Sequence, residues 1–428
     1  MGIQRFGIRS YAGGRVRHAA VVRAGKWVFG TGLRASDESG LIDAGVRRDG
    51  HPLSVPPRAQ REAEFIFDRL RYDLAQADSS LGHVVRVDQY YPHWSAVDPY
   101  HVARKNALGK VVAPSTSILV ERLLNLDAQM DLQVLAVTKD SGLTPEPINV
   151  ARVGAPKESG YSASLRVGDL VFVAGQLARD ESGGLAPEAQ VPAGQLWKGT
   201  RIKLETGYLV RQRLQPALQA SGSGLDLVLK AQVYLSCVDD LPAFWQAWSE
   251  AFDGNVPPTT IVPVKHPGFG TQDATIEVNV IAANESARDR IKQIDCDVEL
   301  VCPGMAPARA FDGLLFVSGL MAIDSAGVVD AARSDASMPF YQSNAAAEMA
   351  DILGKAKTIF EAAGSDLSQV VRALHFHTDL ADFYDTYREW EKQIGDIGLP
   401  FSAIQVNERL FVPGTTLILD LWGFIPES

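Results

Sequence analysis

The sequence predicts an α/β protein in which three copies of one domain follow each other along the chain. The first observation is a short apolar run that ends in glycine and occurs three times, with the glycines at Gly32, Gly175 and Gly319. A turn with glycine precedes each run, a pattern typical of a β-hairpin. The glycines are 143 and 144 residues apart. That period matches a whole domain and exceeds the roughly 20 to 50 residues of a solenoid repeat.

A proline phrase and an acidic residue recur with the same period. The phrase begins at Pro114, Pro257 and Pro400, with 143 residues between successive prolines. About one strand later, an acidic residue interrupts an alternating apolar run, and these residues are Asp131, Glu277 and Asp420. Because three markers recur in one order, we predict three domains, over residues 16–138, 157–284 and 303–427.

Within each predicted domain, the apolar spacing indicates the order hairpin, helix, strand, helix, strand. Helical spacing predicts helices over residues 58–77, 98–111, 201–220, 242–252, 344–363 and 381–394. Runs rich in β-branched residues predict strands over residues 84–91, 227–236, 274–283 and 370–377. We expect residues 1–15 to form an arm of weak pattern, 138–156 a linker, and 285–297 a linker or a short helix.

Bulk properties favour a soluble globular protein. A length of 428 residues fits about three domains, and 46% hydrophobic with 21% charged residues is ordinary globular composition. The net charge of −10 argues against a nucleic-acid or anionic-membrane surface. The three cysteines have no metal-ligand spacing, and we find no signal peptide or run long enough to span a membrane. We therefore expect a cytoplasmic protein without disulfides.

The order of motifs resembles the Rid family of reactive intermediate (enamine/imine) deaminases, also called YjgF-like. The matching segments in the second domain are residues 170–176, 220–230, 241–244 and 276–277, and those in the third are residues 362–364, 370–372 and 380–383. The resemblance implies chorismate-mutase-like domains, each a mixed sheet with two helices on one face. Family members form homotrimers with ligand clefts between subunits. We therefore expect one chain to form a pseudo-trimer, present as a monomer or as a dimer of such rings, that binds a small-molecule substrate.

The resemblance also implies a catalytic carboxylate in each domain, at Asp131, Glu277 and Asp420. In the family, this acid orients or activates the water that attacks an imine carbon. One carboxyl group whose pKa is raised towards neutrality can both deliver a proton and activate water. The alternative is that each acid lies on the outward face of its strand and is simply solvated. We expect most activity where Glu277 lines a cleft.

Substrate binding departs from the family pattern. The family's carboxylate-binding arginine falls on Thr116, Thr259 and Ser402, so the substrate either lacks the usual carboxylate or binds it differently. The remaining candidate binding residues are Tyr161, at the family's tyrosine position, Gln176, at the end of the matched strand, Arg104, at a helix position where it can replace the lost anion binder, and His266, in a Pro/Gly loop that can overhang a cleft. The alternatives are a packed aromatic for Tyr161, a surface arginine for Arg104 and a plain surface loop around His266.

A metal site is not expected. His375 and His377 alternate on one strand and point to one face, where imidazoles can ligate a metal. No third ligand has convincing spacing. We therefore predict a cofactor-free hydrolase of the deaminase type, acting in catabolism on an enamine, imine or related C–N bond. The alternatives are another enzyme on the same scaffold, such as a ring-opening amidohydrolase or lyase, and a non-catalytic binding or chaperone-like protein.

Overall fold

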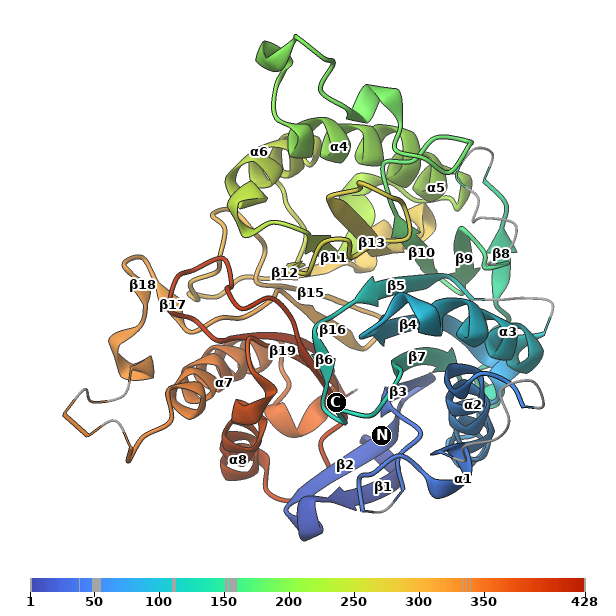
Figure 1. Cartoon of the computed structure of the whole chain (residues 1–428), viewed down its shortest axis with the longest axis vertical. Helices are drawn as coiled ribbons and strands as arrows, with labels where there is room; N and C mark the ends of the chain where they lie inside the picture. Colours follow the sequence, from blue (N-terminus) through green and yellow to red (C-terminus); the bar gives the residue numbers. More distant parts are fainter. Residues whose placement is uncertain are drawn as a thin grey trace.

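Three mixed β-sheets surrounded by helices make up the computed structural model, which describes residues 2–426 apart from 38, 48–54, 110–112, 151–152, 154–159, 334, 336 and 339. The strands gather in the middle of the molecule and the helices lie on the outside (Figure 1). This arrangement confirms the predicted α/β fold class. Among the described residues, no helix combines the length and the apolar composition needed to cross a membrane.

The three large sheets share one strand order. Sheet 1 runs β1 (Gln4–Tyr11), β2 (Val16–Ala24), β3 (Trp27–Leu33), β7 (Asp131–Val137), β4 (Val84–Tyr91) and β5 (Ser115–Leu119). Sheet 2 runs β8 (Glu146–Ile148), β9 (Ser164–Val167), β10 (Leu170–Gln176), β13 (Ile276–Ala283), β11 (Val228–Leu235) and β12 (Thr259–Pro263). Sheet 3 runs β14 (Lys292–Ile294), β15 (Ala308–Phe311), β16 (Leu314–Val317), β21 (Leu417–Phe424), β19 (Val370–His377), β20 (Phe401–Gln405) and β6 (Arg122–Leu123). A separate two-stranded sheet pairs β17 (Ile323–Asp324) with β18 (Gly327–Val328).

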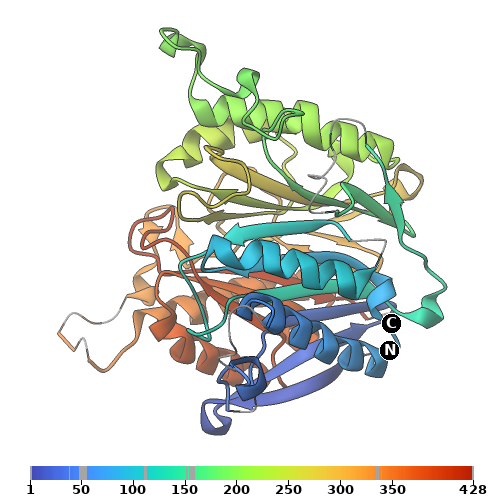
Figure 2. The ribbon, with the colours of Figure 1, turned by 45° about the vertical axis from the view of Figure 1, so that its right-hand side comes forward.

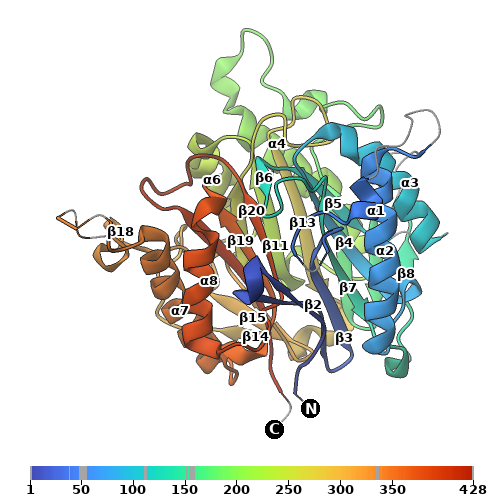
Figure 3. The same cartoon turned by 60° about the horizontal axis from the view of Figure 1, so that its bottom comes forward.

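Two main helices accompany each sheet. They are α2 (Arg58–Gln76) and α3 (Val97–Leu108) for sheet 1, α4 (Arg201–Leu209) continued by α5 (Gln215–Ala220) and then α6 (Leu241–Ala251) for sheet 2, and α7 (Asn344–Ala362) and α8 (Phe383–Ile394) for sheet 3; a short helix α1 (Ala44–Arg47) precedes α2. These bounds agree closely with the helices predicted from the apolar spacing. Figure 2 shows α2 and α3, in blue and cyan, covering the strands of sheet 1. Figure 3 shows α7 and α8 on one side of the strands and α2 and α3 on the other.

The repeated apolar strands are buried on both faces. In β10, Val171 and Val173 belong to the core under the helices of sheet 2, whereas Leu170 and Phe172 belong to a second core shared by all three sheets. Alternate residues of a strand point to opposite faces, so a continuous apolar run fills both cores. Phe29 and Phe316, each three residues before its own repeated glycine, join Phe172 in the shared core.

The stretches between the predicted domains contain strands that the sequence did not indicate. The segment expected to be an arm forms β1, and the segments expected to be linkers contain β8 and β14. Each of these strands pairs antiparallel with the first strand of the following hairpin. An open sheet edge leaves backbone groups without partners, and these additional strands cover that edge. The predicted domain limits stay predictions.

The sheets meet in a closed cycle of three seams, each formed where a repeated glycine approaches β5, β12 or β20 of another sheet. Gly32 of sheet 1 donates its backbone N–H to Ser402 Oγ of sheet 3 at 2.8 Å. Gly319 of sheet 3 donates its backbone N–H to the carbonyl of Thr259 in sheet 2 at 3.1 Å. A Cβ atom at Gly175 of sheet 2 would lie 3.3 Å from Thr116 Cγ2 in sheet 1. Each sheet therefore contributes to two seams.

This cycle predicts that one chain is a complete ring in solution, because no seam is left open for another subunit. Light scattering coupled to size exclusion should give the mass of one chain, or of two chains if rings pair face to face. A stable assembly of three chains would contradict the prediction.

Candidate active site

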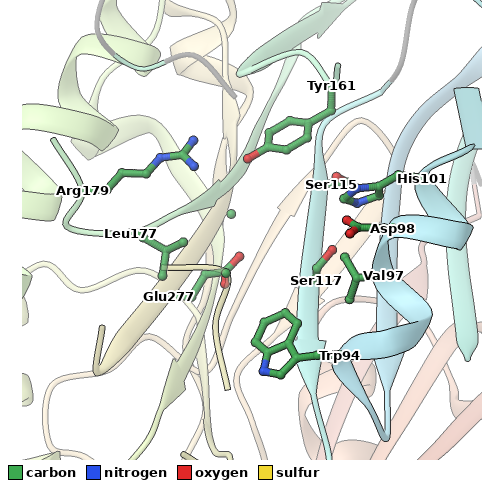
Figure 4. Close-up of a pocket in the computed structure, with 12 residues that line it drawn as sticks. Trp94, Val97, Asp98, His101, Ser115, Ser117, Tyr161, Leu177, Arg179 and Glu277 are labelled. Carbon is green, nitrogen blue, oxygen red and sulfur yellow. The ribbon is translucent and has the colours of Figure 1, made fainter. Parts of the chain in front are cut away.

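A cavity of about 400 Å³ opens at the seam between sheets 1 and 2. Its walls come from both sheets: Trp94, Val97, Asp98, His101, Ser115 and Ser117 on one side, and Tyr161, Gly175, Leu177, Arg179, Gly270 and Glu277 on the other. The guanidinium of Arg179 and the phenol oxygen of Tyr161 point towards the same space as the carboxyl group of Glu277 (Figure 4). The cavity thus brings together an acid, a cation and a phenol from segments far apart in the sequence.

Glu277 combines burial with access to this cavity. It lies on β13 on the same face as Asn279, and its side chain is 4% exposed. Burial raises the pKa of Glu277 to about 8, against the opposing effect of Arg179 and with a smaller contribution from Asp88. The group is therefore mostly protonated at neutral pH and changes its charge just above it. This is the behaviour that a combined proton donor and acceptor needs.

Gly175 fixes the approach of this carboxyl group to the strand beside it. A Cβ atom at position 175 would lie 2.0 Å from Glu277 Oε1, so any other residue would displace the carboxyl group. The repeated glycine is therefore a steric requirement of the site as well as the end of a strand. The sequence pattern marked both Gly175 and Glu277 but not that they are in contact across the sheet.

Arg179 is a cavity residue that the sequence reasoning missed. It lies three residues beyond the end of β10 and is 8% exposed. Positions two and four after Gly175, occupied by Leu177 and Arg179, both line the cavity. The spacing of Arg179 from the repeated glycine is therefore the sequence signal that predicts it as a cavity residue. A guanidinium at this point supplies a cation for a carboxylate ligand.

The wall from sheet 1 is mixed in character. Ser115 and Ser117 alternate on β5 and present hydroxyl groups, and Trp94 and Val97 provide apolar surface. Burial, together with Arg104 and Lys105, lowers the pKa of His101 to about 3, so its imidazole is neutral at physiological pH. The wall therefore offers hydroxyl groups, a neutral imidazole and the carboxyl group of Asp98 beside an aromatic surface, which suits a small organic molecule with polar groups.

Asp131 occupies the position of Glu277 in sheet 1 but is held in an ion pair. Tyr90 on β4 pairs with Asp131, just as the corresponding Tyr234 on β11 pairs with Glu277. Arg34 Nη1 lies 2.8 Å from Asp131 Oδ2, and Ser402 Oγ donates to Oδ1 at 2.8 Å. Asp131 is fully buried and is not among the residues that line the cavity. We infer a structural role for it.

The sequence alignment of Asp420 with the other two acids is wrong by two residues. Asp420 pairs with Leu374 on β19, a register shared by Gln133 and Asn279 in the other sheets. The position equivalent to Glu277 is Ile418, which pairs with Phe376. A strand alternates with period two, so a shift of two residues keeps a side chain on the same face and leaves the sequence pattern unchanged.

Asp420 closes the seam between sheets 3 and 2. Lys230 Nζ lies 2.6 Å from Asp420 Oδ1, Arg372 Nη1 lies 2.5 Å from Oδ2, and Thr260 Oγ1 donates to Oδ1 at 2.6 Å. These two cations hold the pKa of the buried Asp420 at about 2, although burial alone would raise it. A carboxylate held in this way is poorly suited to exchange protons near neutral pH.

Most of the other predicted binding residues lie outside the cavity. Tyr161 lines it and is half-buried, with the Arg104 guanidinium 5.8 Å from its ring centre. Arg104 is fully buried and donates to Ser115 Oγ at 2.9 Å, so the surface alternative for it is wrong. The remaining candidates are not cavity-lining residues: Thr116, Thr259 and Ser402 are buried at the seams, Gln176 accepts from Arg213 Nε at 3.2 Å, and His266 is exposed on its loop.

His375 and His377 share one face of β19, as their spacing predicts. Both are buried, and the indole of Trp390 donates to His375 Nε2 at 3.2 Å. Phe383 packs against both imidazoles. They are therefore core residues beneath α8. Within the described ranges, no three His, Cys, Asp or Glu side chains come together in a way that could hold a metal ion.

Comparisons with known proteins identify the family and the fold of the chain. The family described as Endoribonuclease L-PSP matches residues 154–284, which contain β9 to β13. A chorismatase crystal structure, 12% identical, covers 80% of this chain and 93% of its own with a TM-score of 0.50, which shows a shared fold. The mitochondrial protein mmf2 of Schizosaccharomyces pombe is 27% identical over 32% of this chain and 96% of its own. A RutC family protein of Pyrococcus abyssi is 33% identical over 31% of this chain and 92% of its own length. The chain therefore belongs to the RutC family, the Rid or YjgF-like family that its motifs resemble.

Proposed function

We propose that this protein is a small-molecule hydrolase of the deaminase type with its active site in the cavity between sheets 1 and 2. The observation that carries the proposal is Glu277, a carboxyl group with a pKa of about 8 on the wall of a cavity that also contains Arg179. We further propose that all three units are copies of the family's domain. Only one of their acids remains available for catalysis.

The proposed reaction uses Glu277 for every proton transfer. Its carboxylic acid protonates the β-carbon of an enamine, which gives an iminium ion and the carboxylate. The carboxylate then takes a proton from a water molecule as the oxygen attacks the iminium carbon. Glu277 next protonates the nitrogen of the carbinolamine, the C–N bond breaks, and the carboxylate accepts the hydroxyl proton. The products are a carbonyl compound and ammonia, and Glu277 ends protonated as it began.

Arg179 favours a substrate that carries a carboxylate. The family arginine is missing from Thr116, but Arg179 places a guanidinium on the wall of the same cavity. A guanidinium binds a carboxylate through two parallel hydrogen bonds. Trp94 and Leu177 would contact the apolar part of such a substrate.

A second candidate reaction is hydrolysis of a carboxylated enol ether. The same two steps, protonation of one carbon and attack of water on the adjacent carbon, hydrolyse an enol ether as well as an enamine. The aromatic wall at Trp94 and the cation at Arg179 favour a carboxylated ring as the substrate. Chorismate, a ring carboxylate with an enolpyruvyl ether, is the natural test compound because the fold neighbour is a chorismatase.

Purified protein should be given two kinds of substrate in parallel. Carboxylated enamines, generated in situ from amino acids, test for ammonia release, and chorismate tests for pyruvate release. The enamine proposal predicts faster ammonia formation with the protein than with buffer or with Glu277→Gln. Release of pyruvate alone would favour the enol ether reaction. No product in either assay would contradict both.

Replacing Arg179 should weaken binding more than turnover. Arg179→Gln removes the cation but keeps hydrogen-bonding groups, so we expect KM for a carboxylated substrate to rise by about 10- to 100-fold, the range for a lost charge-assisted pair of about 1.5–3 kcal/mol. For a neutral ester of the same substrate, the wild type and Arg179→Gln should have similar KM values. Steady-state kinetics with acid and ester measures both. Equal KM values for wild type and variant with the acid would show that Arg179 does not bind it.

A further inference from the structure

Asp98 is an acidic residue on the wall of the candidate active site that the proposed reaction does not use. It lies in the first turn of α3, and its side chain is exposed. Its carboxyl group points into the cavity from the side of sheet 1, whereas Arg179 lies on the side of sheet 2 (Figure 4). Within the described residues, Asp98 has neither a hydrogen-bond donor nor a cation as its partner. Its oxygen atoms are therefore available to a ligand.

Asp98 and Arg179 give opposite charges to the two walls of the cavity. The acid Glu277 and the imidazole of His101 on the same lining add little charge near neutral pH. Burial raises the pKa of Glu277 to about 8, so its carboxyl group is mostly protonated. Burial also lowers the pKa of His101 to about 3, so its imidazole is neutral. A ligand that complements both walls therefore has an anionic end and a cationic end.

His101 extends the surface that Asp98 offers to the cationic end. The two residues are three positions apart on α3, so their side chains lie on the same face of the helix, and both line the cavity. A neutral imidazole has one nitrogen that accepts a hydrogen bond, and a carboxylate only accepts. An ammonium or iminium nitrogen carries positive charge and N–H donors. It matches this face of α3, whereas a carboxylate would be repelled by Asp98.

The acid and the imidazole occur together at one of the three corresponding places in the chain. Asp98 lies two residues before the buried Tyr100, and His101 lies one residue after it. The corresponding buried aromatic residues in the other two units are Phe244 and Phe383. Counting from them places Pro242 and Ala381 at the position of Asp98, and Trp245 and Tyr384 at the position of His101. The anionic wall thus belongs to the seam that contains Glu277.

We propose that Asp98 and His101 bind a cationic nitrogen, so that this cavity selects a dipolar substrate whose carboxylate binds Arg179 and whose nitrogen lies at α3. The inference rests on the proposed function, and it adds the substrate class: aminated carboxylates in which an organic body spans the cavity of about 400 Å³ between the two charges. The iminium ion formed in the proposed reaction carries its charge at the same nitrogen. Asp98 is then a specificity-determining residue, and Glu277 keeps every proton transfer.

Unreactive ligand pairs that differ only in the amino group test this selection. A rigid pair is 4-(aminomethyl)benzoate with 4-methylbenzoate, and a flexible pair is 6-aminohexanoate with hexanoate. Titration calorimetry should show tighter binding of the amino member to the wild type. Asp98→Asn should weaken the binding of the amino member by about 10- to 100-fold, the range for a lost charge-assisted hydrogen bond, and leave the other member unchanged. Arg179→Gln should weaken both members.

Two further variants separate a role in selection from a general effect of charge. Asp385→Asn removes an acid from the first turn of α8, the counterpart of α3, and should bind both members as the wild type does. Asp98→Lys should reverse the preference, so that terephthalate, which has a carboxylate in place of the aminomethyl group, binds more tightly than 4-(aminomethyl)benzoate. A residue with only a structural role would not produce this reversal.

The proposal would be overturned if the wild type bound neither amino probe more tightly than its partner, or if Asp98→Asn weakened both members of a pair equally. Unchanged binding of the probes by Arg179→Gln would place them elsewhere and would also overturn it. The proposed function fails by a different result, the absence of turnover with every substrate offered. Selective binding of the amino probes without any turnover would support the nitrogen site and contradict only the proposed reaction.

Discussion

Glu277→Gln is expected to lower kcat by about 10² to 10⁴, the usual contribution of a general acid–base group. Glutamine keeps the size of the side chain but neither delivers nor accepts a proton. In the wild type, kcat/KM should fall as pH rises through about 8, because Glu277 must be protonated to begin the reaction. Steady-state rates from pH 6 to 10 measure both effects.

The melting temperature distinguishes a catalytic role of Glu277 from a structural one. Its pKa in the folded chain lies above the ordinary 4.5, so the folded state binds the proton more tightly than the unfolded state. The stability that this proton contributes is complete below about 4.5 and is lost as pH rises through about 8. The melting temperature of Glu277→Gln should therefore equal that of the wild type near pH 5 and exceed it near pH 9. Glu348→Gln, at a buried carboxyl of helix α7 whose pKa burial raises to about 7, is the matched control and should keep full turnover. Full turnover in Glu277→Gln would refute the mechanism.

Asp420→Asn should lose stability and keep its turnover, the opposite of what we expect for Glu277→Gln. Removing the carboxylate leaves Lys230 and Arg372 buried at the seam without their charge partner. Breaking a buried ion pair in this way lowers the free energy of unfolding by about 3–5 kcal/mol. Urea unfolding measures the change, and turnover per folded molecule should stay near the wild-type value.

A surface ion pair provides the comparison for Asp420. Asp396 contacts Arg17 at 3.0 Å, and their side chains are 56% and 36% exposed. Asp396→Asn should change the free energy of unfolding by less than about 1 kcal/mol, the usual limit for exposed pairs. If Asp420→Asn were as stable as Asp396→Asn but inactive, Asp420 would belong to a catalytic site.

The repeat and the elements of the fold were predictable from sequence because each depends on local periodicity. The predicted helix 58–77 is α2, and the predicted strand 84–91 is β4. Strands β8 and β14 were missed because each has three residues and is largely exposed, so neither carries an apolar pattern. One contains Pro147, which normally argues against a strand and is tolerated here at a sheet edge.

The candidate site was only partly predictable, for a different reason. Strand alternation placed Glu277 on the polar face, and the structure adds what surrounds it. Asp131 and Asp420 differ from Glu277 because of hydrogen-bond partners that are distant in the sequence. Ser402 is 271 positions from Asp131, and Thr260 is 160 from Asp420. Such pairs depend on how sheets meet, and no pattern within one strand encodes them. Arg179 lies past the end of its strand, so the strand pattern did not include it, and only its spacing from Gly175 marks it.

The different partners of the three seams have a consequence for the trade-off between activity and stability. A buried carboxyl group without a direct ion pair destabilises the fold at alkaline pH, yet the raised pKa that results is what the proposed reaction requires of Glu277. A ring of three identical chains would place such a group at all three seams. In a single chain, such a group can occur at one seam only, at Glu277. The other two seams can then contain buried ion pairs, Arg34 with Asp131 and Lys230 with Asp420. Joining the three units in one polypeptide thus allows two seams to hold the ring together while the third is left free to react.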